Sequence, residues 1–250
     1  MMRRCLPLLA LIAALLPEIA MAAAATAPAL PEISLGRIGE QTVSVPLQIL
    51  LLMTVLTVLP AILLGMTAFT RIIIVLGLLR QALGTGQAPS NQVLLALALF
   101  LTALIMMPIV DRAWMDGIAP YLNGQMELFP AIEAAGKPIR GFMLAQIREN
   151  DLMTFAALAG HQGYATPDDV PFTVLAPAFL TSEVKTAFEI GFLLFIPFVV
   201  IDLVVASTLM SMGMMMMSPM LISAPFKILL FVLVDGWVLV VGSLAASFHT

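Results

Sequence analysis

Three charged residues stand alone in the apolar C-terminal region of this chain. Residues 190–250 contain Asp202, Lys227 and Asp235 and no other Asp, Glu, Lys or Arg. A charge at the centre of a bilayer costs about 2.5–3.5 kcal/mol on insertion scales, so each is a candidate functional residue. The midpoint of 202 and 227 is 214.5, inside a turn rich in Met and Gly. A helical hairpin that bends there places Asp202 and Lys227 at equal depth, which predicts an ion pair that offsets the cost of burying each charge.

These charges allow more than one function. The Asp202–Lys227 pair either fixes only the register of the hairpin or takes a direct part in transport. Asp202 and Asp235 on neighbouring helices also allow an intramembrane aspartyl protease, because two carboxylates that share a proton can activate water. Asp235 lies in the sequence Val-Asp-Gly, without a Gly-x-Gly-Asp context, which disfavours this alternative. A small-ion or proton channel is a further alternative.

The second candidate site is the methionine run between these charges. Thioether side chains are flexible and apolar, so the run is either filler for an irregular core or a deformable seal around an axis shared by several copies. A Cu(I) site is a third possibility, because thioethers suit that ion, but no Cys or His lies near. The run consists of Met210, Met212, Met214, Met215, Met216, Met217 and Met220.

No other pattern indicates catalysis or a cofactor. The chain has no His-Glu-x-x-His, Gly-x-Ser-x-Gly or phosphate-loop motif. Its two histidines, His161 and His249, lie in a polar loop and at the chain end, which disfavours a metal site built on them. We therefore expect a protein that is not an enzyme and holds no metal or other cofactor.

Composition places the chain in a membrane. Hydrophobic residues make up 61% of the 250 residues and charged residues 10%, against about 25% charged in soluble domains. The net charge of −4 disfavours nucleic acid as a partner. We predict an all-α membrane protein.

The N-terminus has the pattern of an export signal. Arg3 and Arg4 precede an apolar run at 6–16, which is too short to span a bilayer, and small residues at Ala20 and Ala22 mark a cleavage site. We predict a cleaved signal peptide at 1–22, followed by a loose exported arm at 23–45. Cys5 is the chain's single cysteine and lies in the part removed, so no disulfide is expected.

The rest of the chain divides by charge. A first helical hairpin is predicted at 46–110, entered at Pro46, kinked at Pro60, restarted at Pro89-Ser90-Asn91 and ended or bent at Pro108. Residues 111–189 hold ten acidic and five basic residues and are predicted to form a small helical domain, with its best helix at 138–159. Residues 190–250 form a second hairpin around the Met-rich turn. Its first helix begins near 182 and would span about 46 Å to position 212, which exceeds the hydrocarbon core of about 30 Å.

Charge also predicts the topology. The segment between the first two helices carries Arg71 and Arg80 and no acid, so the positive-inside rule places this predicted loop in the cytoplasm. Residues 111–189 then lie on the periplasmic side. Glu183 and Lys185, at the start of the third long helix, are expected to be a solvated first turn or a subunit contact.

Over about residues 43–250 the chain resembles a known family, the FliP/SctR proteins of type III export gates. The likeness rests on PAILL (60–64), FTRIIIV (69–75), NQVLL (91–95), TSEVKTAF (181–188), FIPF (195–198), IDLV (201–204), GMMM (213–216), PFK (225–227) and FVLVDGW (231–237). The signal peptide is more similar to the flagellar branch of the family.

The resemblance implies a channel subunit that passes unfolded flagellar proteins across the bacterial inner membrane. It implies a homo-oligomer, a pentamer, with FliQ-like and FliR-like membrane subunits and other export-gate components, wound into a helical ring-like channel with much of its mass on the periplasmic side of the flagellar basal body. The methionine run resembles the gasket of that channel. Matching positions imply assembly contacts at Phe142, Arg148 and Phe155, and Glu183 and Lys227 match charges of the family. We add Glu183 and Lys185 to the expected assembly contacts because of their place at the start of the third long helix. Glu189 replaces a polar uncharged residue of the family, and its charge is unexplained.

Overall fold

The computed structural model describes residues 32–38, 41–161, 163–214 and 217–248. The predicted signal peptide at 1–22 lies outside these residues. The chain divides into two compact units, 1–60 and 61–250. Most of the described residues are helical, as predicted from the composition.

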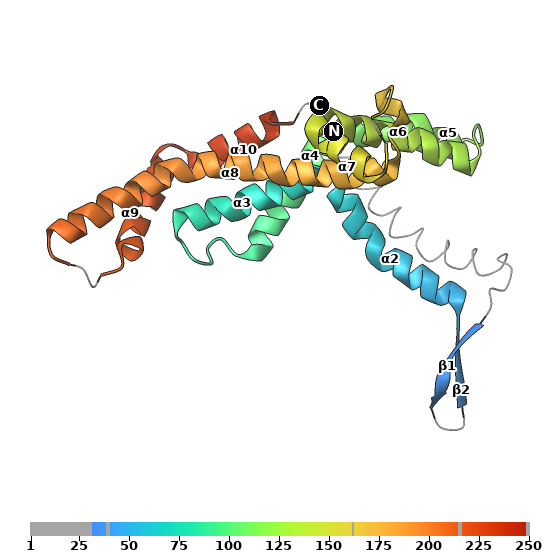
Figure 1. The fold of residues 1–250 in the computed structure, drawn as a ribbon, viewed down its shortest axis with the longest axis horizontal. Coiled ribbons are helices and arrows are strands. Elements are labelled where there is room, and N and C mark those ends of the chain that lie inside the picture. Colours follow the sequence, from blue (N-terminus) through green and yellow to red (C-terminus); the bar gives the residue numbers. More distant parts are fainter. Residues whose placement is uncertain (1–31, 39–40, 162, 215–216, 249–250) are drawn as a thin grey trace. The chain divides into compact units, whose positions relative to one another are not determined.

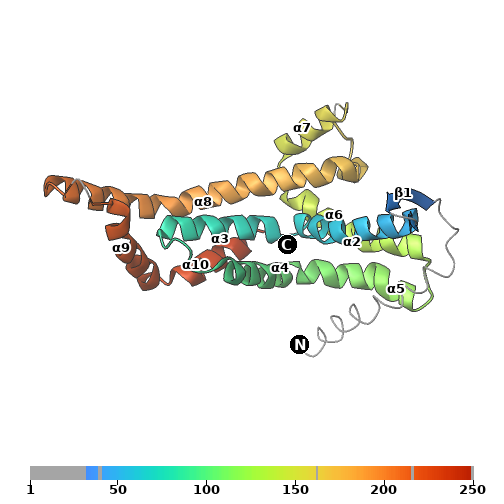
Figure 2. The same ribbon diagram turned by 90° about the horizontal axis from the view of Figure 1, so that it is seen from below.

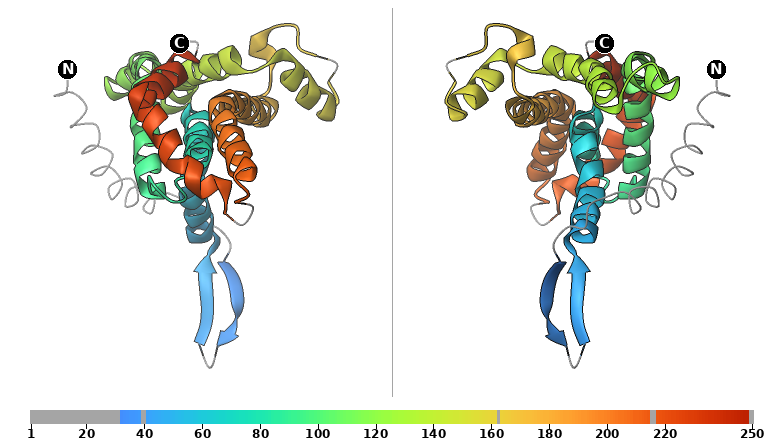
Figure 3. Two further views of the ribbon diagram at one scale, coloured as in Figure 1. Left: turned by 90° about the vertical axis from the view of Figure 1, so that its left-hand side faces the viewer. Right: turned by 90° about the vertical axis from the view of Figure 1, so that its right-hand side faces the viewer.

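The first unit contains the one described pair of strands. Strand β1 (Glu32–Ile38) pairs antiparallel with β2 (Gln41–Pro46), in a register that places Ile33 opposite Val45 and Ser34 opposite Ser44 (Figure 3). Residues 32–45 are therefore not the loose arm that their Ala, Pro and Gly content predicted. β-Branched residues alternate with polar ones in QTVSVP, which is a pattern typical of a strand. Helix α2 (Leu47–Gly65) begins directly after Pro46, close to the predicted start, and continues through Pro60.

The second unit is organised around helix α3 (Phe69–Leu83). Figure 2 shows α3 lying between α8 (Phe172–Ser211) and α4 (Asn91–Ala113), and it packs against both. Its inner residues recur at helical spacing and are fully buried, at Ile72, Val75, Leu76 and Leu79. The core of this unit therefore forms where α3 meets its two neighbours.

The predicted loop between the first two helices is in fact helix α3. Arg71 and Arg80, assigned to a loop by their charge, both lie on this helix, and Arg71 is only 2% exposed. The loop prediction is wrong because a buried arginine with internal partners carries no information about the side of a membrane. The α3–α4 connection instead follows Leu83, and α4 begins at Asn91 with Ser90 at its N-cap, as predicted.

The charged middle region is helical but divided differently from the prediction. Helix α4 continues through Pro108 into a π-helical segment, η1 (Trp114–Ile118), and α5 (Ala119–Leu122). The helix predicted at 138–159 is two helices, α6 (Leu128–Gln146) and α7 (Glu149–Leu158), with extended backbone at Ile147 and Arg148 between them. A short 3₁₀ turn, η2 (Pro167–Asp169), precedes α8.

The C-terminal region forms the predicted hairpin with one extra break. Helix α8 begins at Phe172, ten residues before the predicted start, and ends at Ser211, and α9 (Pro219–Leu233) returns from the turn (Figure 1). The last apolar segment then breaks at Asp235, whose φ is 53°, and α10 (Gly236–Ala246) is a separate helix. The predicted single second helix is therefore wrong, because the left-handed backbone at Asp235 ends α9.

Among the described residues, two continuous helical segments are long and apolar enough to cross a membrane, at Asn91–Leu122 and Phe172–Ser211. Two broken pairs, Leu52–Gly65 with Phe69–Leu83 and Pro219–Leu233 with Gly236–Ala246, raise the number to four if each pair is one span. The 40 residues of α8 extend about 60 Å at 1.5 Å per residue, about twice the hydrocarbon core.

Candidate functional site

The structure brings Asp202 and Lys227 together across the α8–α9 hairpin. Lys227 Nζ lies 2.7 Å from Asp202 Oδ2, and the Lys227 side chain is buried while that of Asp202 is 32% exposed. Ser223, one turn before Lys227 on α9, donates from its hydroxyl to Asp202 Oδ1 over 2.6 Å. Both carboxylate oxygens of Asp202 therefore accept a hydrogen bond from α9.

Lys227 also connects this hairpin to α3. Its ammonium donates to the carbonyl oxygen of Ala82 over 3.1 Å. Ala82 lies in the last turn of α3, where carbonyls have no partner within the helix, and the negative end of the helix dipole attracts a cation there. One ammonium thus caps α3 and pairs with α8, which sets the position of the α8–α9 hairpin against the core helix.

This arrangement does not resemble a catalytic aspartyl dyad. Asp202 is engaged by an ammonium and a hydroxyl, whereas Asp235 is exposed at the break between α9 and α10. The backbone carbonyl of Asp235 accepts from the N–H groups of Val238 and Leu239, so this residue starts α10. The two carboxylates have different partners and different structural positions, which does not favour the protease alternative.

A second buried charge cluster, which sequence reasoning missed, is centred on Arg71. Its Nε donates to Glu183 Oε2 over 2.9 Å and its Nη2 donates to Glu183 Oε1 and, over 3.1 Å, to Gln146 Oε1. Its Nη1 donates to the carbonyl and hydroxyl oxygens of Ser247 over 2.8 and 3.0 Å. All five guanidinium N–H groups thus have acceptors, and the Phe248 ring lies 4.0 Å from Cζ.

The Arg71 cluster joins four parts of the second unit. Arg71 is on α3, Gln146 ends α6, Glu183 is on α8 and Ser247 follows α10. Glu183 is fully buried within the chain, so its carboxylate is used internally and is not part of the chain's exposed surface. No sequence pattern links Arg71 to Glu183, because 112 residues separate them.

The extended backbone between α6 and α7 is held by Arg148. Its backbone N–H donates to Ser182 Oγ over 3.1 Å, and its guanidinium donates to Thr186 Oγ1 and, over 2.8 Å, to Glu189 Oε1. The hydrogen bonds to Glu189 raise the pKa of the Arg148 guanidinium above its ordinary value. Glu189, whose charge the sequence left unexplained, is thereby the α8 partner that fixes the α6–α7 break.

The other residues implied as assembly contacts lie around this region. Phe142 is buried and packs edge-on against Phe179, with ring centroids 6.0 Å apart, and stacks on Phe248 at 6.3 Å. Phe155 is half-buried against the core, and Lys185 is half-exposed with its Nζ 3.7 Å from Asp151. Of the charged residues in this set, Lys185 has the most exposed side chain, at 49% against 35% for Arg148.

The described methionines of the α8–α9 turn are exposed. Met210 and Met212 are 64% and 72% exposed, and Gly213 turns the chain with a φ of 75°. Met214, Met217 and Met220 are also exposed, while Met215 and Met216 lie outside the described residues. Side chains this exposed do not fill the core of their own chain, which disfavours the core-filler alternative. Within the described ranges, no three His, Cys, Asp or Glu side chains gather as metal ligands.

Comparison with the sequences of known proteins assigns this chain to a family. The sequence model of the FliP family matches residues 52–244. The flagellar biosynthetic protein FliP of Cereibacter sphaeroides is 61% identical over 210 residues, which are 84% of this chain and 70% of that protein. The FliP proteins of Caulobacter vibrioides and Bacillus subtilis are 54% and 50% identical, over 92% and 83% of this chain and 86% and 94% of their own lengths.

Proposed function

Since the chain belongs to the FliP family of flagellar biosynthetic proteins, we propose that it forms the core of the channel that passes unfolded flagellar proteins across the bacterial inner membrane. It is a component of the flagellar export apparatus and not an enzyme. The family match over residues 52–244 is the observation that carries this proposal.

The exposed surface of α8 supports an assembled channel. A helix of about 60 Å is too long for one conventional span, and large apolar side chains cover its outer face. A single chain in water would not leave such a surface uncovered, so lipid or neighbouring subunits must cover it. We propose that further copies do so, as a pentamer with FliQ-like and FliR-like subunits. These side chains are Phe188, Phe192, Leu193, Ile196, Val199, Val200, Leu203 and Val204.

The exposed Met-rich turn is the proposed gasket. If copies of the α8–α9 hairpin surround one axis, their turns project flexible thioether side chains toward it. Such an apolar constriction excludes ions by dewetting and still yields to a passing chain, because methionine repacks at small cost. The Asp202–Lys227–Ala82 contacts support this role, since they fix each hairpin against its own α3 and hence the position of its turn.

The remaining parts of the proposal concern location. We propose that residues 1–22 are a cleaved signal peptide, that 23–45 and 111–189 lie on the periplasmic side, and that the two hairpins, 46–110 and 190–250, contribute the membrane and channel surfaces. The break at Arg148 and the half-exposed Lys185 are the proposed points of assembly in the periplasmic part.

The test combines assembly with leakage. The native mass of the detergent-extracted complex should correspond to a pentamer of this chain, and it should increase when the FliQ-like and FliR-like partners are present. Replacing four methionines of the Met-rich turn with alanine should leave that mass unchanged and make the membrane conduct small ions. Loss of the complex without leakage would identify core filling, and an assembled but ion-tight complex would refute the seal. The residues changed are Met212, Met214, Met215 and Met216.

A further inference from the structure

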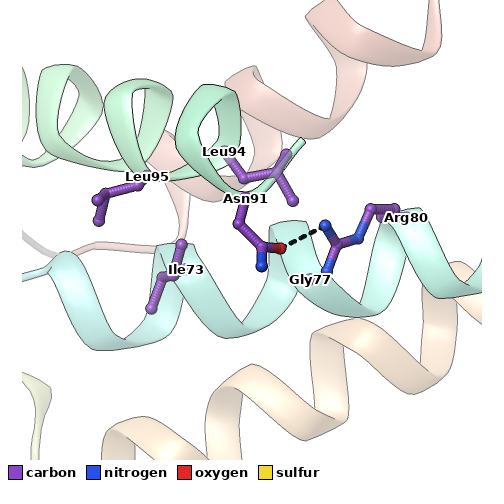
Figure 4. A pocket seen from close by; sticks show the side chains of 6 residues that line it. All are labelled: Ile73, Gly77, Arg80, Asn91, Leu94 and Leu95. Carbon is purple, nitrogen blue, oxygen red and sulfur yellow. Dashed lines mark hydrogen bonds between the residues drawn. The ribbon is translucent and has the colours of Figure 1, made fainter. Parts of the chain in front are cut away.

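A groove between α3 and α4 has the chemistry of a lipid site. Its volume is about 320 Å³, which is ten times the roughly 30 Å³ that one water occupies in the liquid and lies in the range of ligand pockets. It is lined by Ile73, Gly77, Arg80, Asn91, Leu94 and Leu95. The hydrogen bond between Arg80 and Asn91 lies over Gly77, and Ile73 and Leu95 lie to one side of it (Figure 4). The groove is therefore polar where Arg80 meets Asn91 and apolar at Ile73 and Leu95.

The polar end carries an arginine with donors to spare. Arg80 Nη1 donates to Asn91 Oδ1 over 2.6 Å and to the Pro89 carbonyl oxygen over 3.3 Å. Its Nε and Nη2 make no hydrogen bond, and it forms no ion pair, with the described part of the chain. Residues 41–110 contain no acidic residue at all. The guanidinium is thus held in place by one edge and presents the other, uncompensated, to an anion.

A glycine adds open space to the groove. No atom lies within 4 Å of the position that a Cβ on Gly77 would occupy. Ile73 lies about 10 Å along α3 from Arg80, since seven residues rise 1.5 Å each. Leu94 and Leu95 lie one turn inside α4 from Asn91. This spacing matches a ligand with an anionic head at the end of the α3–α4 hairpin and an apolar chain extending along it.

We propose that this groove binds an anionic phospholipid, with its phosphodiester on Arg80 and part of an acyl chain along Ile73 and Leu95. Charge complementarity favours lipid over an uncharged apolar segment, because a partner without an anion would leave the Arg80 donors unused. The groove also lies on helices apolar enough to meet the bilayer, with Arg80 and Asn91 at a helix end, where headgroups and basic residues meet. This inference goes beyond the export function and does not depend on it.

Native mass spectrometry of the full chain in mild detergent tests the proposal. With phosphatidylglycerol added, wild type should retain one lipid more than tenfold better than with diacylglycerol of the same chains, because diacylglycerol has no phosphodiester and cannot accept the charge-assisted hydrogen bond from Arg80. Arg80→Gln should lower retention about tenfold. Gly77→Leu should do the same by filling the groove; a Cβ at this position meets no atom within 4 Å, and leucine favours the helix.

Two matched controls make the result specific. Arg112→Gln removes an exposed arginine of α4, and Gly242→Leu adds the same side chain to α10, at a glycine whose Cβ position also has no atom within 4 Å. Both variants should retain lipid as wild type does. Equal retention by Arg80→Gln and wild type would overturn the proposal. Displacement by inorganic phosphate at lipid concentrations would show a free-anion site instead. Unchanged lipid retention with a lower native mass of the Gly77→Leu complex would show that a neighbouring protein fills the groove.

Discussion

Replacing Arg71 by methionine should strongly destabilise the chain. Methionine is also a long unbranched side chain but has no charge, so the fully buried Glu183 is left without its counter-ion. Breaking a buried pair by removing one partner typically costs about 3–5 kcal/mol, because an uncompensated charge remains. Since domains are stable by only about 5–15 kcal/mol in total, one substitution would remove a large fraction of the free energy of unfolding.

The double variant separates this cause from simple loss of contacts. In Arg71→Met/Glu183→Met no buried charge remains, and replacing a whole buried pair by apolar side chains is often neutral. The carbonyl oxygen of Ser247 loses its donor in both variants, so this loss does not contribute to the difference between them. We therefore expect the double variant to be more stable than Arg71→Met alone, by about 3–5 kcal/mol.

The assay is denaturant unfolding of the full chain in mild detergent, followed by the fluorescence of its two tryptophans. Arg112→Met, at an exposed arginine of α4, is the matched control and should change the free energy of unfolding by less than about 0.5 kcal/mol. A double variant as unstable as Arg71→Met, or less stable, would show that the contacts of the arginine matter and the unpaired carboxylate does not.

Three further predictions follow from other positions. Asp202→Ala should lower the free energy of unfolding by about 3 kcal/mol, because it leaves the buried Lys227 ammonium unpaired. Lys227→Ala should lower it less, because the carboxylate left unpaired is 32% exposed. Exchanging the two residues should recover part of the assembly measured by native mass, and equal failure of the exchanged and single variants would contradict the pairing. Gly117→Ala should lower the melting temperature, because its Cβ would lie 2.4 Å from the carbonyl oxygen of Ala131. Gly141→Ala is the matched control: its Cβ meets no atom within 4 Å, and the substitution should raise the melting temperature by adding about 0.5–1 kcal/mol to the free energy of unfolding. Intact mass of the membrane-extracted protein should correspond to a chain that begins near Ala23, and retention of the full sequence would reject the signal peptide.

The local elements that the sequence located correctly are those with local causes. The start of α4 after Pro89-Ser90 and the start of α2 after Pro46 depend on proline and capping residues within one turn. The α8–α9 hairpin was found in the same way, since a Gly/Met turn between two apolar runs leaves few alternatives. The Asp202–Lys227 contact then required only that the two charges lie at equal distances from that turn.

Where prediction failed, distant partners decided the backbone. The helix predicted at 138–159 breaks at Ile147 and Arg148 because the Arg148 backbone and side chain are held by Ser182, Thr186 and Glu189 of α8. Helical spacing of apolar residues continues across this break, so periodicity gives no warning of it. The break of the last apolar segment coincides with Asp235, the one charged residue after Lys227 in the sequence, whose left-handed backbone ends α9.

The sequence alone determined that this protein belongs in a membrane, that two of its C-terminal charges pair across a turn, and that this turn is built from methionine. Those properties depend on composition or on residues close to one bend, where chain geometry leaves little freedom. Only the tertiary structure decided the role of Arg71, because a charge at the start of an apolar helix reads equally well as a solvated topological marker or as a buried centre. Its five acceptors come from α6, α8 and the end of α10, and such a convergence exists only once those helices are packed together.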